Sequence, residues 1–214
     1  MSRPGTVDSD ALRTVDAAAD ASLLVQGSKF IAHLAPVATT ADADSILTLR
    51  QRRYPDATHH CWAYRLGRPE PLIERSSDAG EPSGTAGRPI ADELRRAELE
   101  NVVCVVTRYF GGTKLGTGGL VRAYAAAARG AIDAATITTR TVVQNVTIDF
   151  DFDRTGVVFH TLGQFGVHLV PGAYDSRAHG TAKVPLSKVT TLCQRLAELA
   201  PSGVELSLGE REIL

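Results

Sequence analysis

Two kinds of hydrophobic pattern follow one another along the chain. Short stretches that alternate between apolar and polar residues, or that are apolar throughout, predict β-strands. They cover residues 29–34, 58–66, 71–75, 102–107, 142–150, 167–174, 179–184 and 204–208. Longer stretches with helical spacing or a high alanine content predict helices. These cover residues 41–54, 89–99, 120–135, 154–165 and 186–199. The strand at 102–107 is β-branched and apolar on both faces, so we expect it to be buried on both sides.

The order of these elements predicts two domains. A threonine-rich stretch, Thr136–Thr141, separates the alanine-rich helix from a second half with the predicted order β-α-β-β-α-β, as in a ferredoxin-like sandwich. A chain of 214 residues is also longer than most single domains. We therefore expect an α+β protein with an N-terminal tail (1–21), an N-terminal domain (22–137) and a ferredoxin-like C-terminal domain (138–214).

Composition narrows the classes of protein that fit. Hydrophobic residues make up 43% of the chain and charged residues 22%, which excludes a disordered chain. The net charge is −1, so a general polyanion binder is excluded and any phosphate or nucleic-acid site must be a local patch. The three cysteines stand in unrelated contexts, which argues against a disulfide framework and for the reducing cytoplasm. Met1–Asp20 lacks the basic and apolar regions of a secretory signal.

The candidate chemistry centres on a glycine-rich segment with positive charge. Five of the 19 glycines lie between Tyr109 and Leu120, after the predicted buried strand and before the alanine-rich helix. From Asn101 to Ile132 the chain has basic residues but no acidic one. Glycine lets a ligand approach the backbone, and a helix N-terminus presents unpaired amides, so the pattern is typical of an anion site. The predicted phosphate-binding residues are Arg108, Tyr109, Gly111, Gly112, Lys114, Gly116, Thr117, Gly118, Gly119 and Arg122.

The glycine-rich segment also has a plainer interpretation. It matches neither the Walker nor the dinucleotide-binding glycine pattern. A turn of this kind can serve only to let a strand and a helix pack closely. If the segment does bind RNA, the ring of Tyr109 or Phe110 could stack on a base beside the phosphate.

Four further polar residues could act as an acid or base or contact a partner. They are Asp78, Glu81, His60 and Lys29. The two acids flank a loop rich in turn residues, although a pair of surface acids without a function is the commoner case. We expect no metal, because the adjacent His59, His60 and Cys61 would point to opposite faces of a strand.

Catalysis has little support in the sequence. A cysteine nucleophile needs a base and an orienting group, and the sequence supplies neither for Cys61 or Cys104. Both are therefore expected to be buried structural residues. We expect no cofactor and assign no catalytic residue.

Several of these motifs together resemble the IMPACT/YigZ family. They are Ser28–Phe30, His59–Tyr64, Asp78–Gly87 and, above all, Arg108–Tyr124. The resemblance implies an N-terminal α/β domain with the domain-2-like fold of a small-subunit ribosomal protein. That fold includes a left-handed βαβ crossover, an exception to the usual handedness. The C-terminal domain is similar to a terminal domain of elongation factor G. At Ser76–Gly80 the family more often has two adjacent acids, so a cation held there by a carboxylate pair is less well supported.

The resemblance also frames the expected function. Eukaryotic relatives restrain translational control during amino-acid starvation by binding a regulatory partner. They bind it through an additional domain, so the resemblance does not imply the same partner for this chain. We expect a non-catalytic cytoplasmic regulator, associated with translation or stress, that binds RNA, the ribosome or another phosphate-bearing partner through the glycine-rich loop and the helix start. No membrane partner is expected.

Two alternative functions stay open. One is an enzyme that acts on a phosphorylated small molecule or nucleotide at the same loop. The other is a protein–protein adaptor without a nucleic-acid ligand. A deep pocket that joins the loop to Glu81 would favour the enzyme, whereas a flat basic surface would favour a polymer.

Overall fold

The structure is a computed structural model that describes residues 10–68, 71–172, 176–200 and 202–214. Within it the chain forms two compact units. Residues 12–139 form the first, called the N-terminal unit, and residues 140–214 with the described residues up to Ala11 form the second, called the C-terminal unit. The chain passes between the units within the strands β1 (Ala11–Val15) and β7 (Ile137–Phe150). The division in β7 lies close to the predicted boundary.

The N-terminal unit is built on an antiparallel sheet with the strand order β2-β3-β6-β4-β5. Both β3 and β4 pair antiparallel with β6, so they run parallel to each other and are joined through α1. The strands are β2 (Ala19–Val25), β3 (Ser28–Pro36), β4 (His59–Leu66), β5 (Ile73–Ser77) and β6 (Val102–Tyr109).

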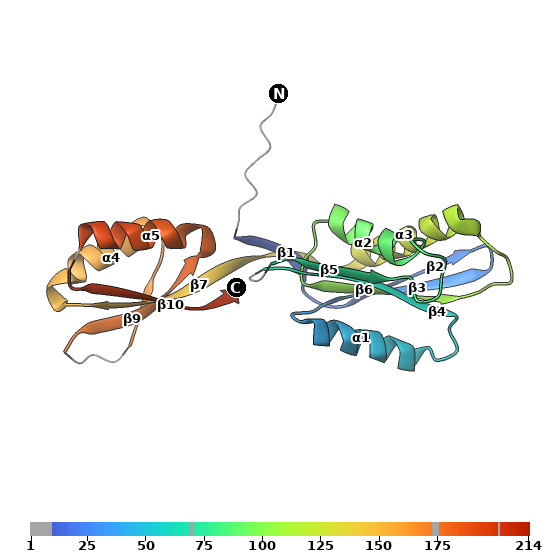
Figure 1. The fold of residues 1–214 in the computed structure, drawn as a ribbon, viewed down its shortest axis with the longest axis horizontal. Coiled ribbons are helices and arrows are strands. Elements are labelled where there is room, and N and C mark those ends of the chain that lie inside the picture. Colours follow the sequence, from blue (N-terminus) through green and yellow to red (C-terminus); the bar gives the residue numbers. More distant parts are fainter. Residues whose placement is uncertain (1–9, 69–70, 173–175, 201) are drawn as a thin grey trace, which may run out of the picture. The chain divides into compact units, whose positions relative to one another are not determined.

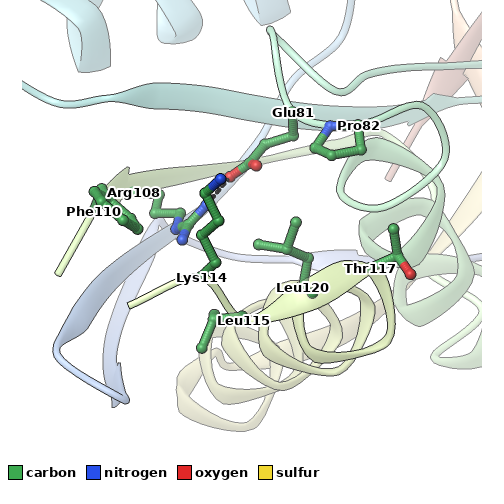
Figure 2. Close-up of a pocket in the computed structure, with 9 residues that line it drawn as sticks. Glu81, Pro82, Arg108, Phe110, Lys114, Leu115, Thr117 and Leu120 are labelled. Atoms are coloured by element: carbon green, nitrogen blue, oxygen red, sulfur yellow. Dashed lines mark hydrogen bonds and ion pairs between the residues drawn. The ribbon is translucent and has the colours of Figure 1, made fainter. Parts of the chain in front are cut away.

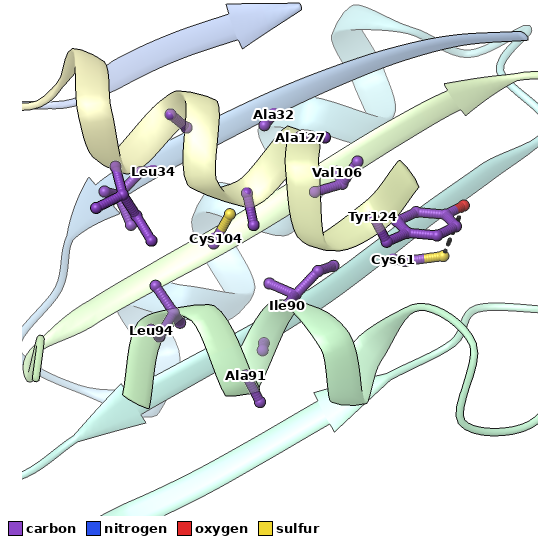
Figure 3. Packing of buried hydrophobic residues seen from close by; sticks show 14 of the residues in the cluster. Ala32, Leu34, Cys61, Ile90, Ala91, Leu94, Cys104, Val106, Tyr124 and Ala127 are labelled. Carbon is purple, nitrogen blue, oxygen red and sulfur yellow. Dashed lines mark hydrogen bonds between the residues drawn. The ribbon is translucent and has the colours of Figure 1, made fainter. Parts of the chain in front are cut away.

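Helices cover both faces of this sheet (Figure 1). They are α1 (Thr40–Arg53), α2 (Gly87–Arg96) and α3 (Gly116–Ala134). On the face covered by α1, the β6 residues Val103 and Val105 pack with Ala43. On the opposite face, Cys104 and Val106 pack beneath α2 and α3 (Figure 3). The prediction that this strand is buried on both sides is therefore confirmed.

The C-terminal unit is the predicted ferredoxin-like sandwich. Its strands lie in the order β10-β7-β9-β8 with antiparallel neighbours, and the elements follow the order β-α-β-β-α-β. Ile148, Leu162 and Leu192 meet in a core between the sheet and the two helices. The other elements are a short 3-10 turn (Phe152–Arg154), α4 (Thr155–Gln164), β8 (Leu169–Pro171), β9 (Ala178–Pro185), α5 (Leu186–Leu199) and β10 (Val204–Ile213).

Part of the predicted N-terminal tail is sheet instead. Residues 11–15 and 19–25 form β1 and β2, because alternate side chains such as Leu12 and Leu23 are turned to the interior. Both strands are short and contain charged residues such as Arg13 and Asp20, so the alternation does not stand out in the sequence. Residues 1–9 of the predicted tail, and 173–174 of the predicted strand 167–174, lie outside the described residues.

Helix α3 begins at Gly116 rather than at the predicted Leu120. Leu115 packs against the core and Leu120 is buried in it, so the turn between them is held in helical form. This packing offsets the low helix propensity of glycine, which costs about 1 kcal/mol per residue relative to alanine. The end of the glycine-rich segment is therefore helix and not loop. Among the described residues no helix is both long and apolar enough to cross a membrane.

Candidate phosphate and ligand site

A pocket of about 350 Å³ opens beside the first turn of α3. The loop after β5, the end of β6 and the start of α3 meet there (Figure 2). We call it the α3 pocket; it is lined by Glu81, Pro82, Arg108, Phe110, Lys114, Leu115, Gly116, Thr117 and Leu120. Four of the predicted phosphate-binding residues are thus brought together, and one of the predicted acids joins them.

Arg108 is not the free cation that the acid-free stretch of sequence predicts. Its Nη1 donates a hydrogen bond of 2.6 Å to Glu81 Oε1, and its Nη2 donates one of 3.3 Å to Ser28 Oγ. Arg108 is only 5% exposed and Glu81 only 9%. Glu81 lies in the loop after β5, far from Arg108 in the sequence. The stretch around Arg108 therefore has no acidic residue in the sequence, but the folded site does. The charge of Arg108 is neutralised inside the protein.

Glu81 belongs to a buried network that continues into the core. The Tyr124 hydroxyl donates a hydrogen bond of 2.7 Å to Glu81 Oε1, and Cys61 Sγ lies 3.3 Å from the Tyr124 oxygen (Figure 3). Burial raises the pKa of Cys61 to about 12, and burial together with Cys61 and Glu81 raises the pKa of Tyr124. Cys61 and Cys104 are both buried, as predicted. The Cys61 thiol is protonated at neutral pH, so it is not an activated nucleophile.

Asp78 holds the loop that carries Glu81 rather than facing a ligand. Its carboxylate accepts hydrogen bonds from the amides of Gly84, Ala86 and Gly87, at 2.7, 2.9 and 2.8 Å. Burial acts to raise the pKa of Asp78, but the three amides outweigh it and leave the pKa below its ordinary value. Two of these amides belong to the start of α2, so Asp78 caps that helix. The predicted role of Asp78 as an acid or base does not fit this position.

The start of α3 is where positive charge stays available. The first turn of α3 contains no acidic residue, and the N-cap residue before it, Leu115, provides no side-chain cap. The amides of that turn therefore keep their partial positive charge. Lys114 and Arg122 are exposed, and neither forms an ion pair with any residue in the described ranges. Gly116 has φ +68° and open space beside it. The remaining turn residues, Thr117, Gly118 and Gly119, are exposed or half-buried.

Three predicted residues lie on the other face of the sheet. Alternation along β6 and β3 turns Tyr109 and Lys29 away from Arg108 and Ser28, towards the face covered by α1. The Tyr109 hydroxyl donates a hydrogen bond of 2.9 Å to Asp56. The third residue is His60, whose Nδ1 lies 3.1 Å from Thr107 Oγ1. Burial and the charge of Arg50 both lower the pKa of His60. These three residues are not part of the α3 pocket.

Gly111 follows the plainer, structural interpretation of the glycine-rich segment. A Cβ at this position would lie 1.9 Å from the carbonyl carbon of Gly27, so only glycine lets the end of β6 approach the turn between β2 and β3. The Gly111 amide donates a hydrogen bond of 3.2 Å to Ser28 Oγ. Gly112, with φ +85°, has open space around it. Of these two glycines, only Gly112 leaves its surroundings free for a ligand.

The apolar walls of the pocket and one histidine are not evident from the sequence. Pro82, Leu115 and Leu120 line the pocket, although nothing in their spacing marks them as site residues. His59, rather than His60, faces Glu81, with 3.9 Å between Nε2 and Oε1. Its Nδ1 donates a hydrogen bond of 2.9 Å to the Ala79 carbonyl. Among the described residues, no group of three or more His, Cys, Asp or Glu side chains is placed to hold a metal ion.

Comparison with known proteins places these features in a family. The Impact N-terminal domain family matches residues 26–132. The IMPACT family member YvyE of Bacillus subtilis (strain 168) is 30% identical over 197 residues, which is 92% of this chain and 90% of that protein. The IMPACT family member YigZ of Escherichia coli (strain K12) is 30% identical over 183 residues, 85% of this chain and 90% of that protein.

A solved structure extends the likeness to the fold. The crystal structure of a hypothetical protein, 28% identical, matches 94% of this chain and 98% of its own with a TM-score of 0.64. The family match spans the motifs at Ser28, Asp78 and Arg108 and the whole lining of the α3 pocket. The chain therefore belongs to the IMPACT family.

Proposed function

We propose that this protein is a regulator that acts in translation by binding the phosphate groups of RNA, free or in the ribosome, at the start of α3. The observation that carries this proposal is the pairing of an acid-free helix N-terminus with two exposed cations, Lys114 and Arg122, that have no ion-pair partner in the described part of the chain. Helix amides and unpaired cations together favour a bound phosphate. Membership in the IMPACT family supports the regulatory part of the proposal.

The contact is weak and moderately sensitive to salt. With Arg108 neutralised by Glu81, two cations remain to displace counterions from the nucleic acid. For a single strand, two neutralised phosphates give a slope of about −1.4 in the logarithm of affinity against that of salt. Affinity then falls about sevenfold between 50 and 200 mM salt. Such a contact is independent of sequence and suits a protein that binds reversibly.

Catalysis at the same pocket is less well supported than binding. Glu81 and the start of α3 do line the same pocket. An enzyme that acts on a phosphorylated small molecule would require this arrangement. However, the Glu81 carboxylate already accepts hydrogen bonds from Arg108 and Tyr124. It could take a proton from a ligand only by giving up these strong hydrogen bonds. The Asp78 carboxylate accepts hydrogen bonds from the amides at the start of α2. Neither carboxylate is placed as a ready general base.

Charge reversal tests the proposal. In the double variant Lys114→Glu/Arg122→Glu, binding to a labelled single-stranded RNA and co-sedimentation with ribosomes should fall at least about tenfold, because two attractive contacts become repulsive. Lys29→Glu is the matched control, since Lys29 is an exposed lysine on the other face of the same sheet. Its binding should stay within about twofold of the original protein. Unchanged binding by a folded double variant would overturn the proposal.

A further inference from the structure

We infer that the α3 pocket takes an unstacked nucleobase of a single-stranded RNA whose phosphate lies at the start of α3; this inference rests on the proposed function. Phosphate binding alone would need only the helix amides and the exposed cations. The structure adds a cavity of about 350 Å³ directly beside them, with walls formed by Pro82, Phe110, Leu115 and Leu120. A ligand that fills this cavity has an apolar surface next to its charge.

The walls of the pocket suit a flat ring. Phe110 is 47% exposed, which is unusual for a phenylalanine, and it lines the pocket next to Arg108 (Figure 2). Leu120 is 6% exposed and Leu115 is half-buried, so they continue the apolar surface into the protein. Exposed aromatic rings next to positive charge are the usual means by which proteins bind bases of single strands. The volume lies at the lower end for small-ligand pockets, and it suits one base rather than a paired duplex.

The polar floor of the pocket selects a neutral group over a second phosphate. Arg108, a lining residue, is already paired with Glu81, so a phosphate placed there would meet a carboxylate as well as a guanidinium. Arg108 Nε is buried and has no hydrogen-bond partner within the described residues. A buried N–H donor without a partner is unfavourable and favours a ligand that brings an acceptor. The carbonyl oxygens of bases are neutral acceptors of this kind.

The stacking geometry around Arg108 agrees with this assignment. Its guanidinium carbon lies 5.5 Å from the centre of the Phe30 ring and 5.6 Å from that of Phe110. The Phe30 ring is wholly buried and the Phe110 ring is half-exposed, so the guanidinium stands between the core and the pocket.

In a duplex the bases are stacked and paired, and they cannot enter such a pocket without being unstacked. The pocket therefore favours single-stranded RNA.

The test compares three ligands on the full chain by fluorescence anisotropy: a short single-stranded RNA, an abasic sugar-phosphate strand of the same length, and a duplex of the same sequence. We expect the single strand to bind at least about tenfold more tightly than the abasic strand, since stacking of one base is worth that factor. Phe110→Ala should remove this difference, whereas Phe110→Trp should keep it. Tyr109→Ala is the matched control, because that ring lies on the other face of the sheet.

The outcomes separate this inference from the proposed function. If the abasic strand binds as tightly as the single strand, and Lys114→Glu weakens both equally, phosphate binding holds and the base pocket is wrong. The same conclusion follows if folded Phe110→Ala binds the single strand like the original protein, or if the duplex binds more tightly than the single strand. If none of the three ligands binds at 50 mM salt, both proposals fail.

Discussion

Arg108 Nη1 and Glu81 Oε1 lie 2.6 Å apart, and the two side chains are only 6% and 3% exposed. This pair ties the loop after β5 to the end of β6 beneath the α3 pocket. Burying two charges has a large desolvation cost, which their attraction offsets only while both are present. The pair therefore fixes the position of the loop and leaves no net charge at the pocket floor.

Removing one partner of this pair should destabilise the protein strongly. Glu81→Leu leaves Arg108 buried without its carboxylate, so the free energy of unfolding should fall by about 3–5 kcal/mol. The double variant Glu81→Leu/Arg108→Met should recover most of this loss, because no unpaired charge remains. Urea unfolding measures both changes. Asp92→Ala, which breaks an exposed ion pair with Arg95, is the control and should change stability by less than about 1 kcal/mol. If Glu81→Leu were as stable as Asp92→Ala, the buried pair would not contribute to stability in this way.

Gly111 and Gly112 are adjacent but should respond very differently to alanine. A Cβ on Gly111 would lie 1.9 Å from the carbonyl carbon of Gly27, so Gly111→Ala must push two backbones apart and should cost about 3 kcal/mol. Gly112 has φ +85° and open space around it. Gly112→Ala should therefore lower the free energy of unfolding by only about 1–2 kcal/mol, from left-handed backbone strain. Chemical unfolding of the two variants side by side gives the comparison. Equal losses would show that close packing at Gly111 is not what its position requires.

The elements of the fold could be predicted because their signals are local. An apolar β-branched stretch such as Val102–Thr107 can be satisfied only by a strand covered on both faces, and the structure has it in the middle of the sheet. The β-α-β-β-α-β order of the second half likewise determined the ferredoxin-like sandwich. The start of α3 could not be predicted in the same way, because helix propensity argues against glycine and only the packing of Leu115 and Leu120 reveals the first turn.

The site could be predicted only in part because it depends on which face each side chain takes. Alternation separates Arg108 from Tyr109, but β6 is apolar on both faces, so the sequence does not tell which of the two enters the pocket. The partner of Arg108 is equally hidden. Glu81 is 27 residues away, and only the tertiary fold brings it to the guanidinium. Lys114 was easier to place because it lies in the short connection between β6 and α3, whichever residue begins the helix.

Asp78 should make the stability of the protein depend on acid pH. Because its pKa is lowered in the folded state, its contribution is fully present above the unfolded value of about 3.9 and is lost as the pH falls below it. Asp78→Asn removes the charge at the α2 N-terminus and should cost about 1 kcal/mol at pH 7. Urea unfolding at pH 7, 5 and 3 should show the same difference at the two higher values and a smaller one at pH 3. A difference that does not change with pH would contradict a lowered pKa.

The three cysteines should react with thiol reagents in a fixed order. Burial raises the pKa of Cys61 and of Cys104 to about 12, so at pH 8 only about one in ten thousand of these thiols is ionised. Cys193 is half-buried and its pKa is raised by partial burial, so it should be modified first and the other two only when the fold opens. Mass spectrometry after timed labelling identifies the modified residue, and a Cys193→Ser variant should show no early modification.

Cys61 would report on the α3 pocket itself in this experiment. Its Sγ donates a hydrogen bond of 3.0 Å to the Asp78 carbonyl, in the loop that supplies Glu81 to the pocket. Opening of that loop would therefore expose Cys61 while Cys104, deep under α2 and α3, stays protected. If the pocket is preformed, as the buried pair of Glu81 and Arg108 implies, Cys61 and Cys104 should react equally slowly. Labelling of Cys61 well before Cys104 would show instead that the loop opens in the native protein and that the pocket is completed only when a ligand binds.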